Sequence, residues 1–398
     1  MTKNILFLAL NYPDIQSDNN MYTDLMEEFK RNGHKVYVVA SAFETGKTGL
    51  FNEGGVEVLR CKTYAHQTQN LLKKGISNIA MPHQYLQSIE SNFSHLQFDL
   101  ILLPTPPITL LPVVKRLKRK SNAFVYLILR DIFPQNAVDI GLLSKKSPLY
   151  YYFKNIEKKL YAEVDSIGCM SQKNIEYITA HNPSIVDKVH ILRNWQNADF
   201  SEESHKENLK ESLNLKEKFV VFYGGNMSKP QKISNLIPLI KEYQHNDKII
   251  FYFIGKGTEK VSFAKKIEKQ KLKNVYIQDA LSRKEYNKIL SIADVGLVTL
   301  DESFTIPNIP SKSISYLFSG IPILALVDKN TDFGPWVEKK IQSGFWTEAT
   351  DIKKAKKTLD LLINSATLRL EMGERGKKYA HKHLTPQVAY KTILRETT

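Results

Sequence analysis

The chain has 398 residues, 42% of them hydrophobic and 24% charged, and this composition is typical of a soluble globular protein. At this length we expect two domains, each with a sizeable core, rather than one. Lys and Arg number 56 and Asp and Glu 41, a formal net charge of +15. Such an excess predicts an anionic partner: nucleic acid, a membrane surface or a phosphorylated substrate.

Three further features limit the class of protein. No stretch approaches the roughly 20 apolar residues that span a bilayer, so any membrane contact is expected to be peripheral. Lys3 is followed by only a short apolar run, residues 5–10, which is not the pattern of a signal peptide. Cys61 and Cys169 lie far apart and match no metal or redox spacing, so we interpret both as buried reduced thiols of a cytoplasmic protein.

The first half of the chain predicts buried strands separated by helices. The apolar runs, typical of strands covered on both faces, are residues 5–10, 36–40, 100–103, 124–129, 166–170 and 189–192. A helical stripe that includes Leu25 and Phe29 lies between the first two runs, so residues 5–40 form one βαβ unit. Residues 64–93 are polar with scattered apolar positions and are predicted to be helical.

A second series begins after Trp195, where the composition changes. Residues 200–218 are charged, which favours a linker with a short helix. Strands are predicted at residues 219–223, 249–254, 275–277, 295–298 and 323–326, and helices at 233–243, 261–269, 283–292 and from 352 onward. The periodicity predicts two doubly wound α/β domains in tandem. Ligands of open parallel sheets bind at the carboxyl ends of the strands, so we expect the site in the cleft between the domains.

Residues 309–326 predict a short helix between a loop and a strand. Pro310 ends the preceding segment, Ser311 is a good N-cap because its hydroxyl can accept a free amide, and Gly320 marks the C-terminal stop. The helix would begin with free N–H groups beside Lys312, a ready site for an anion such as phosphate. The alternative is an ordinary capped helix between two strands.

A glycine turn follows the strand at residues 219–223. Gly224 and Gly225 can adopt positive φ and let a ligand approach the backbone, and Lys229 and Lys232 add positive charge. These features favour a phosphate cradle, although the spacing is not that of a Walker loop. The alternative is a glycine turn with two solvated lysines.

A second glycine turn, Gly255 to Gly257, follows the strand at residues 249–254. Alone, this turn favours a tight strand-to-helix turn that Thr258 caps over a ligand-binding loop, because a single G-x-G is weak evidence. The three loops at Gly224, Gly255 and Ser311 together predict a domain that holds a diphosphate by backbone amides and lysines. No aspartate pair with metal-ligand spacing accompanies them, so we expect no metal.

Three features of the first half carry alternatives. Arg130 and Asp131 follow the strand at residues 124–129, where a doubly wound domain places active groups, although an exposed salt bridge is the alternative. Residues 115–120 form a basic run that suits a solvated helix end. Residues 150–159 mix aromatics and lysines at helical spacing; this suits an anionic lipid surface, or a helix with one buried and one solvated face.

In this order the loops resemble family 4 glycosyltransferases of the GT-B fold, in particular the bacterial branch that builds O-antigen and capsule. The resemblance runs nearly end to end, and the ordered set is specific although each motif is common. The matching segments are Asn32-Gly33-His34-Lys35-Val36 (R-G-H-x-V), Arg130-Asp131-Ile132-Phe133-Pro134 (D-x-W-P) with Gly141-Leu142-Leu143, Asn194-Trp195 with Asp199-Phe200 (N-[GW]-x-D), Tyr223-Gly224-Gly225-Asn226 with Lys229 (Y-x-G-N-x-x-K), Gly255-Lys256-Gly257-Thr258-Glu259 (G-x-G-x-E), Ala293-Asp294-Val295-Gly296-Leu297 (A-D-V-G-L), and Ile309-Pro310-Ser311-Lys312 with Ser319-Gly320-Ile321-Pro322 (V-P-S-K…A-G-x-P).

The resemblance implies the domains and the site. Residues 1–195 would bind the acceptor, with a C-terminal helix at about 380–398 packed back on them, and residues 196–379 would bind a nucleotide-sugar, usually a UDP-sugar. Asp131 matches a catalytic position that faces the donor sugar, and Lys229 matches a catalytic basic residue beside the diphosphate. The implied donor-binding residues are Gly224, Gly225, Asn226, Gly255, Gly257, Pro310, Ser311, Lys312 and Ser315.

The implied activity is a retaining transfer of a sugar to a lipid-linked or polysaccharide acceptor, without metal or cofactor, in the cytoplasm at the inner face of the cell membrane. The chain departs from the family at Pro307 and Ser315, which stand where two glutamates are usual, and at Asp18-Asn19-Asn20 in place of paired glycines. A nucleotide-sugar-binding partner with weak or no catalysis is therefore the alternative. Nucleic-acid binding is ranked last, because the basic residues are not interleaved with stacking aromatics.

Overall fold

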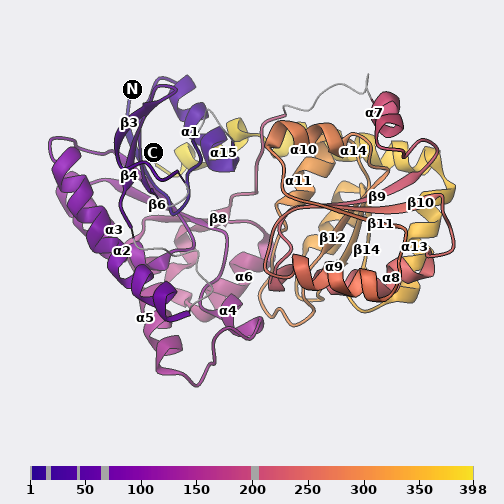
Figure 1. Ribbon diagram of the computed structural model, residues 1–398. Helices are drawn as coiled ribbons and strands as arrows, with labels where there is room; N and C mark the ends of the chain where they lie inside the picture. The colour runs from indigo at the N-terminus through magenta and orange to yellow at the C-terminus, as the bar shows by residue number, and fades with distance from the viewer. Residues whose placement is uncertain (1, 15–18, 43–44, 64–70, 199–205, 398) are drawn as a thin grey trace. The chain divides into compact units, whose positions relative to one another are not determined.

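The computed structural model describes residues 2–14, 19–42, 45–63, 71–198 and 206–397. The chain divides into two units, each described separately below (Figure 1). The N-terminal unit spans residues 1–195 and 386–398, and the C-terminal unit spans residues 196–385.

The N-terminal unit is built on an eight-stranded sheet with the order β3-β4-β2-β1-β5-β6-β7-β8. The strands are β1 (Asn4–Leu8), β2 (Lys35–Ser41), β3 (Gly49–Glu53), β4 (Val56–Cys61), β5 (Leu100–Pro104), β6 (Phe124–Leu129), β7 (Ser166–Cys169) and β8 (Val189–Ile191). Only the β3–β4 pair is antiparallel. The central strand β1 has four fully buried apolar residues, as expected for a parallel sheet covered on both faces.

Helices surround this sheet, and the last helix of the chain is one of them. They are α1 (Met21–Arg31), α2 (Leu71–Asn92), α3 (Leu111–Ser121), α4 (Gln135–Asp139), α5 (Pro148–Glu163), α6 (Gln172–His181) and α15 (Pro386–Arg395), with short 3₁₀ turns η1 (Ile108–Leu110) and η2 (Pro183–Lys188). Tyr390 of α15 packs edge-on against Phe29 of α1, with ring centroids 5.0 Å apart. Its hydroxyl also lies 3.0 Å from Nε2 of His34. These contacts attach the C-terminus to the N-terminal unit.

The C-terminal unit has a six-stranded parallel sheet with the order β11-β10-β9-β12-β13-β14. Its strands are β9 (Phe219–Gly224), β10 (Ile249–Ile254), β11 (Val275–Gln278), β12 (Val295–Thr299), β13 (Ile323–Val327) and β14 (Gly344–Glu348). Its helices are α7 (Lys206–Ser212), α8 (Ile237–Glu242), α9 (Lys260–Lys269), α10 (Arg283–Leu290), α11 (Lys312–Phe318), α12 (Phe333–Pro335), α13 (Ile352–Asn364) and α14 (Ala366–His383), with short turns η4 (Lys229–Gln231) and η5 (Ile233–Leu236) and a π-helix η6 (Trp336–Ile341).

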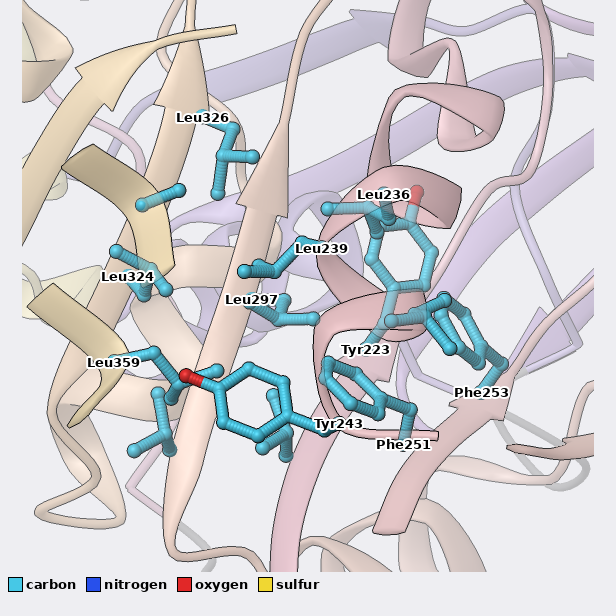
Figure 2. Close-up of a cluster of buried hydrophobic side chains, with 14 of the residues drawn as sticks. Tyr223, Leu236, Leu239, Tyr243, Phe251, Phe253, Leu297, Leu324, Leu326 and Leu359 are labelled. Carbon is cyan, nitrogen blue, oxygen red and sulfur yellow. The ribbon is translucent and has the colours of Figure 1, made fainter. Parts of the chain in front are cut away.

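Helices cover both faces of this sheet. In Figure 1, α10, α11 and α14 lie on one face and α8, α9 and α13 on the other. The second face holds a large apolar core, in which Phe251 and Phe253 of β10 pack with Leu359 of α13. Figure 2 shows Tyr223, at the end of β9, beside Phe253 and Leu236 in this core. The core therefore fixes the strand end where the site is expected.

The structure confirms the predicted fold class and most predicted strands and helices. Three strands were missed: β3 and β4, which form a hairpin around Gly54-Gly55, and β14. The hairpin escaped prediction because it interrupts the alternation of strand and helix and because Leu50 of β3 is exposed.

Cys61 and Cys169 are buried and free, as predicted. Asp18, Asp199 and Phe200 lie outside the described residues. No helix in the described ranges is both long and apolar enough to cross a membrane.

Candidate functional site

The carboxyl ends of β9, β10 and β12 in the C-terminal unit carry the three predicted loops. The turns after β9 and β10 continue the pairing of the two strands beyond their ends. The amide of Gly225 donates to the carbonyl of Ile254 over 2.8 Å, and the amide of Met227 donates to that of Lys256 over 2.8 Å. The two glycine turns therefore pair with each other and form one structural unit. Their order in the sequence alone does not predict this pairing.

Gly255 and Gly257 are glycines because the two turns touch. A Cβ on Gly255 would lie 1.8 Å from the carbonyl oxygen of Gly225, and one on Gly257 would lie 2.4 Å from that of Met227. Both distances are shorter than any real contact, so a side chain would force the turns apart. Thr258 does not cap the helix that follows, since α9 begins after Glu259 and has no side-chain cap.

Gly224 has a packing role of the same kind. A Cβ on it would overlap the hydroxyl of Tyr286 at 2.3 Å. Its amide donates to the hydroxyl of Tyr316 over 3.0 Å, and this hydroxyl lies 3.3 Å from the carbonyl of Leu297, to which it donates. The amides of Gly224, Gly225 and Gly255 all have partners within the protein. These three amides are therefore not free to bind a diphosphate. The positive groups that remain for it at these turns are side chains.

Lys312 is the most unusual side chain at the site. Its Nζ is buried, has no hydrogen-bond partner among the described residues, and lies 3.6 Å from the centroid of the Tyr223 ring. Burial alone lowers the pKa of Lys312 well below its usual value. A Cβ on Gly225, where φ is +124°, would lie 3.5 Å from Cε of Lys312. The lysine thus lies against the turn that follows β9.

Lys229 and Lys232 share one turn but differ in their surroundings. Lys229 opens η4 and is exposed. Lys232 lies 3.4 Å from a carboxylate oxygen of Asp301 and also contacts Glu302, which in turn accepts a hydrogen bond of 2.8 Å from Asn235. The charge of Lys232 is therefore already neutralised, and Lys229 is the lysine of this turn that can serve a ligand.

The start of α11 differs from the prediction. Ser311 has helical φ and ψ of −61° and −28° and makes no side-chain cap, so its predicted capping role is wrong. The physical reason is that a capping residue needs an extended backbone, which Ser311 does not have; the hydroxyl of Ser313, two residues later, donates to the carbonyl of Pro310 over 2.7 Å. Ser315 is buried and donates to Oε1 of Gln196 over 2.8 Å. The predicted stop is confirmed: Gly320 has φ +65°, and a Schellman pair of hydrogen bonds closes the helix.

Asp131 follows β6 in the N-terminal unit, as predicted. Burial raises the pKa of its carboxyl to about 6, while the charge of Arg130 and a hydrogen bond from Asn136 lower it less. Arg130 donates to Oδ1 of Asn194, and its guanidinium lies 4.6 Å from the centroid of the Trp195 ring. Neither Arg130 nor Asp131 is exposed, so the alternative of an exposed salt bridge is wrong.

The structure adds three aromatic residues that sequence reasoning missed as part of the site. Tyr223, Tyr286 and Tyr316 surround Gly224, and burial raises the pKa of all three phenols. The only sequence signal was the aromatic residue that ends a strand immediately before two glycines. Within the described ranges, no group of three or more His, Cys, Asp or Glu residues could hold a metal ion.

Comparison with known proteins agrees with this geometry. Residues 205–379, which include all three loops, match the family model of glycosyl transferases group 1. The chain is 25% identical over 285 residues to a protein named probable glycosyltransferase WbjE of Pseudomonas aeruginosa, and this match covers 70% of each chain.

Solved structures share the fold at low identity. Sucrose-phosphate synthase of Thermosynechococcus elongatus has a TM-score of 0.78 at 12% identity, over 99% of this chain and 98% of that one. Anabaena HepE in complex with UDP-glucose has a TM-score of 0.71 at 13% identity, over 99% and 98%. WaaG, described as a glycosyltransferase involved in lipopolysaccharide biosynthesis, has a TM-score of 0.67 at 11% identity, over 98% of each chain.

Proposed function

We propose that this glycosyltransferase of the GT-B fold, whose residues 205–379 belong to the group 1 glycosyl transferases, moves a sugar from a UDP-sugar to a lipid-linked or polysaccharide acceptor. The observation that carries the proposal is a pair of lysines in the loops that follow strands of the family-matched unit: Lys229 is exposed, and Nζ of Lys312 is buried without a hydrogen-bond partner among the described residues. The UDP and UDP-glucose complexes of HepE support the choice of uridine. The likeness to WaaG, a glycosyltransferase involved in lipopolysaccharide biosynthesis, supports the choice of a lipid-linked or polysaccharide acceptor.

The chemistry requires positive charge at the leaving group. In a retaining transfer, the bond from the anomeric carbon to the diphosphate breaks, and the acceptor oxygen bonds to that carbon on the same face. The acceptor proton passes to the departing phosphate oxygen. Negative charge builds on the diphosphate in the transition state, and Lys229 and Lys312 would stabilise it. Asp131, which matches the family's catalytic position, would stabilise the positive charge that develops on the sugar.

The donor assignment is tested by thermal shift of the full-length protein with UDP-, GDP-, ADP- and dTDP-sugars. A ligand that binds only the folded state at about 100 times its Kd stabilises that state by about 2.7 kcal/mol. We expect UDP-sugars to raise the melting temperature and the others to leave it unchanged. Stabilisation by another nucleotide only, or by none, would contradict the proposal. Binding of a UDP-sugar without turnover or hydrolysis would favour the alternative of a non-catalytic partner.

A patch on the N-terminal unit supports a membrane-bound acceptor. We define the α5 patch as Leu142, Leu149, Tyr151 and Tyr152, whose exposed fractions are 47%, 48%, 64% and 45%. They lie before and within the first turns of α5, while Phe153 of the same helix is buried. Lysines 145, 146, 158 and 159 are exposed nearby, and Glu157 is buried beside Lys154. Exposed aromatic and aliphatic groups among unneutralised lysines suit an anionic bilayer.

Flotation with liposomes tests this surface. Each basic residue near an anionic membrane contributes about 1 kcal/mol, so Lys158→Glu with Lys159→Glu should reduce the liposome-bound fraction at least about tenfold. The matched control is Lys265→Glu with Lys266→Glu on α9, an exposed pair with the same change in charge, which should float like wild type. Wild-type flotation that is indifferent to lipid charge, or equal loss in both variants, would remove the membrane assignment.

A further inference from the structure

We infer that Tyr223 is a positioning residue, whose ring holds the Lys312 ammonium beside the turn after β9 so that its N–H donors stay available for the diphosphate of the donor. The inference rests on the proposed function. It concerns Tyr223, the residue before the last of β9, and Lys312, which begins α11, two residues that only the tertiary structure brings together.

The Tyr223 ring lies beside the Lys312 ammonium, in the position where a protein usually has a carboxylate. A buried ammonium is costly unless a partner compensates it, and the common partner is a carboxylate. The compensating group here is the face of Tyr223, 3.6 Å from Nζ at its centroid. An aromatic face attracts a cation but accepts no conventional hydrogen bond. A carboxylate would neutralise the lysine, as Asp301 and Glu302 do to Lys232, whereas the ring leaves its charge and donors for a ligand.

Tyr223 is itself held rigidly. Its side chain is fully buried in the core of the C-terminal unit, and its ring centroid is 5.5 Å from that of Phe253; Figure 2 shows the two rings side by side. Its hydroxyl donates to the carbonyl of Asn226 over 2.6 Å, within the glycine turn. One residue thus connects the core, the turn and the lysine. Lys312 as a whole keeps part of its surface exposed while its Nζ is buried, so a diphosphate would meet the ammonium through a small movement of this flexible side chain.

The electrostatics predict that donor binding adds a proton. Burial lowers the pKa of Lys312 in the free protein, and a bound diphosphate would raise it, because opposite charge favours the ammonium. Tyr223 is the titratable residue in contact with the Lys312 ammonium; around Tyr223 lie Tyr316 and Glu259, whose charges raise the pKa of its phenol, and burial raises the pKa of Tyr286 and Tyr316 as well. The phenols are uncharged near neutrality, so Lys312 is the group whose protonation would change there.

Calorimetric titration of the full-length protein with UDP tests the inference. A cation–π contact is worth a factor of about ten in affinity. We therefore expect Tyr223→Leu to weaken UDP binding about tenfold, but less than about threefold when Lys312→Met is already present. Tyr223→Phe, which keeps the ring, should bind within about threefold of wild type. At about pH 8, titrations in two buffers of different ionisation enthalpy should reveal proton uptake by wild type and not by Lys312→Met.

Each outcome decides a claim. If wild type does not bind UDP, the UDP-sugar assignment fails and the inference fails with it. If wild type binds UDP but Lys312→Met binds it equally well, or Tyr223→Leu weakens binding equally in both backgrounds, the inference alone is overturned. Should Tyr223→Leu not fold, as judged by circular dichroism, proton uptake by wild type against Lys312→Met and the affinity of Tyr223→Phe still decide it, because neither needs that variant.

Discussion

Asp131→Asn is expected to lower kcat on the order of 10²–10³-fold, because the carboxylate would no longer stabilise positive charge on the sugar in the transition state. The activity of the wild-type protein should likewise depend on ionisation of the Asp131 carboxyl. Since the pKa of Asp131 is raised to about 6 by burial, activity should be full above about pH 7 and fall about tenfold per pH unit below the pKa. The measurement is initial transfer rate, or donor hydrolysis, at saturating UDP-sugar from about pH 5 to 8.

The stability of Asp131→Asn separates a functional loss from misfolding. A carboxyl whose pKa is raised on folding stabilises the protein below its unfolded pKa, and this contribution is lost as pH rises through the folded pKa. At about pH 8 the ionised Asp131 is therefore a cost that asparagine removes, so the variant should melt no lower than wild type. Asp187→Asn, an exposed position in η2, is the control and should keep wild-type activity. A fully active Asp131→Asn, or an activity profile without an acidic limb, would rule out this role.

Periodicity predicted most sheet strands well because strands such as β5, β10 and β13 are continuous buried apolar runs, as expected of strands covered on both faces. The β3–β4 hairpin was missed although Gly54-Gly55 marks its turn, because its first strand is largely exposed and breaks the βαβ rhythm. Ser311 was misassigned because the capping rule is local. The backbone at Ser311 is already helical and its side chain caps no amide, whereas a capping residue needs an extended backbone.

The glycine turns were found from the sequence, but for an incomplete reason. Gly255 and Gly257 were predicted as one of three loops that hold a diphosphate, and the structure shows that each is required by contact with the neighbouring turn. The sequence motif identified Lys312 as a candidate site residue. It did not predict that the Lys312 ammonium has no hydrogen-bond partner among the described residues. No local pattern predicts that Nζ of Lys312, on helix α11, lies against an aromatic ring of strand β9. Periodicity predicts where the site residues lie along the chain, whereas the charge state of their side chains depends on tertiary contacts.

Lys229→Ala is expected to lower kcat on the order of 10²-fold or more, the loss typical of removing one group that stabilises charge in the transition state. Lys229 is exposed at the start of η4, so little folding energy depends on its side chain and the melting temperature should stay within a few degrees. UDP affinity should fall far less than kcat, because the charge on the diphosphate is largest when the sugar departs. Lys241→Ala, an exposed lysine in the last turn of α8, matches the charge change and should retain activity. Equal turnover of the two variants would remove Lys229 from the mechanism and leave Lys312 as the lysine to be tested at the leaving group.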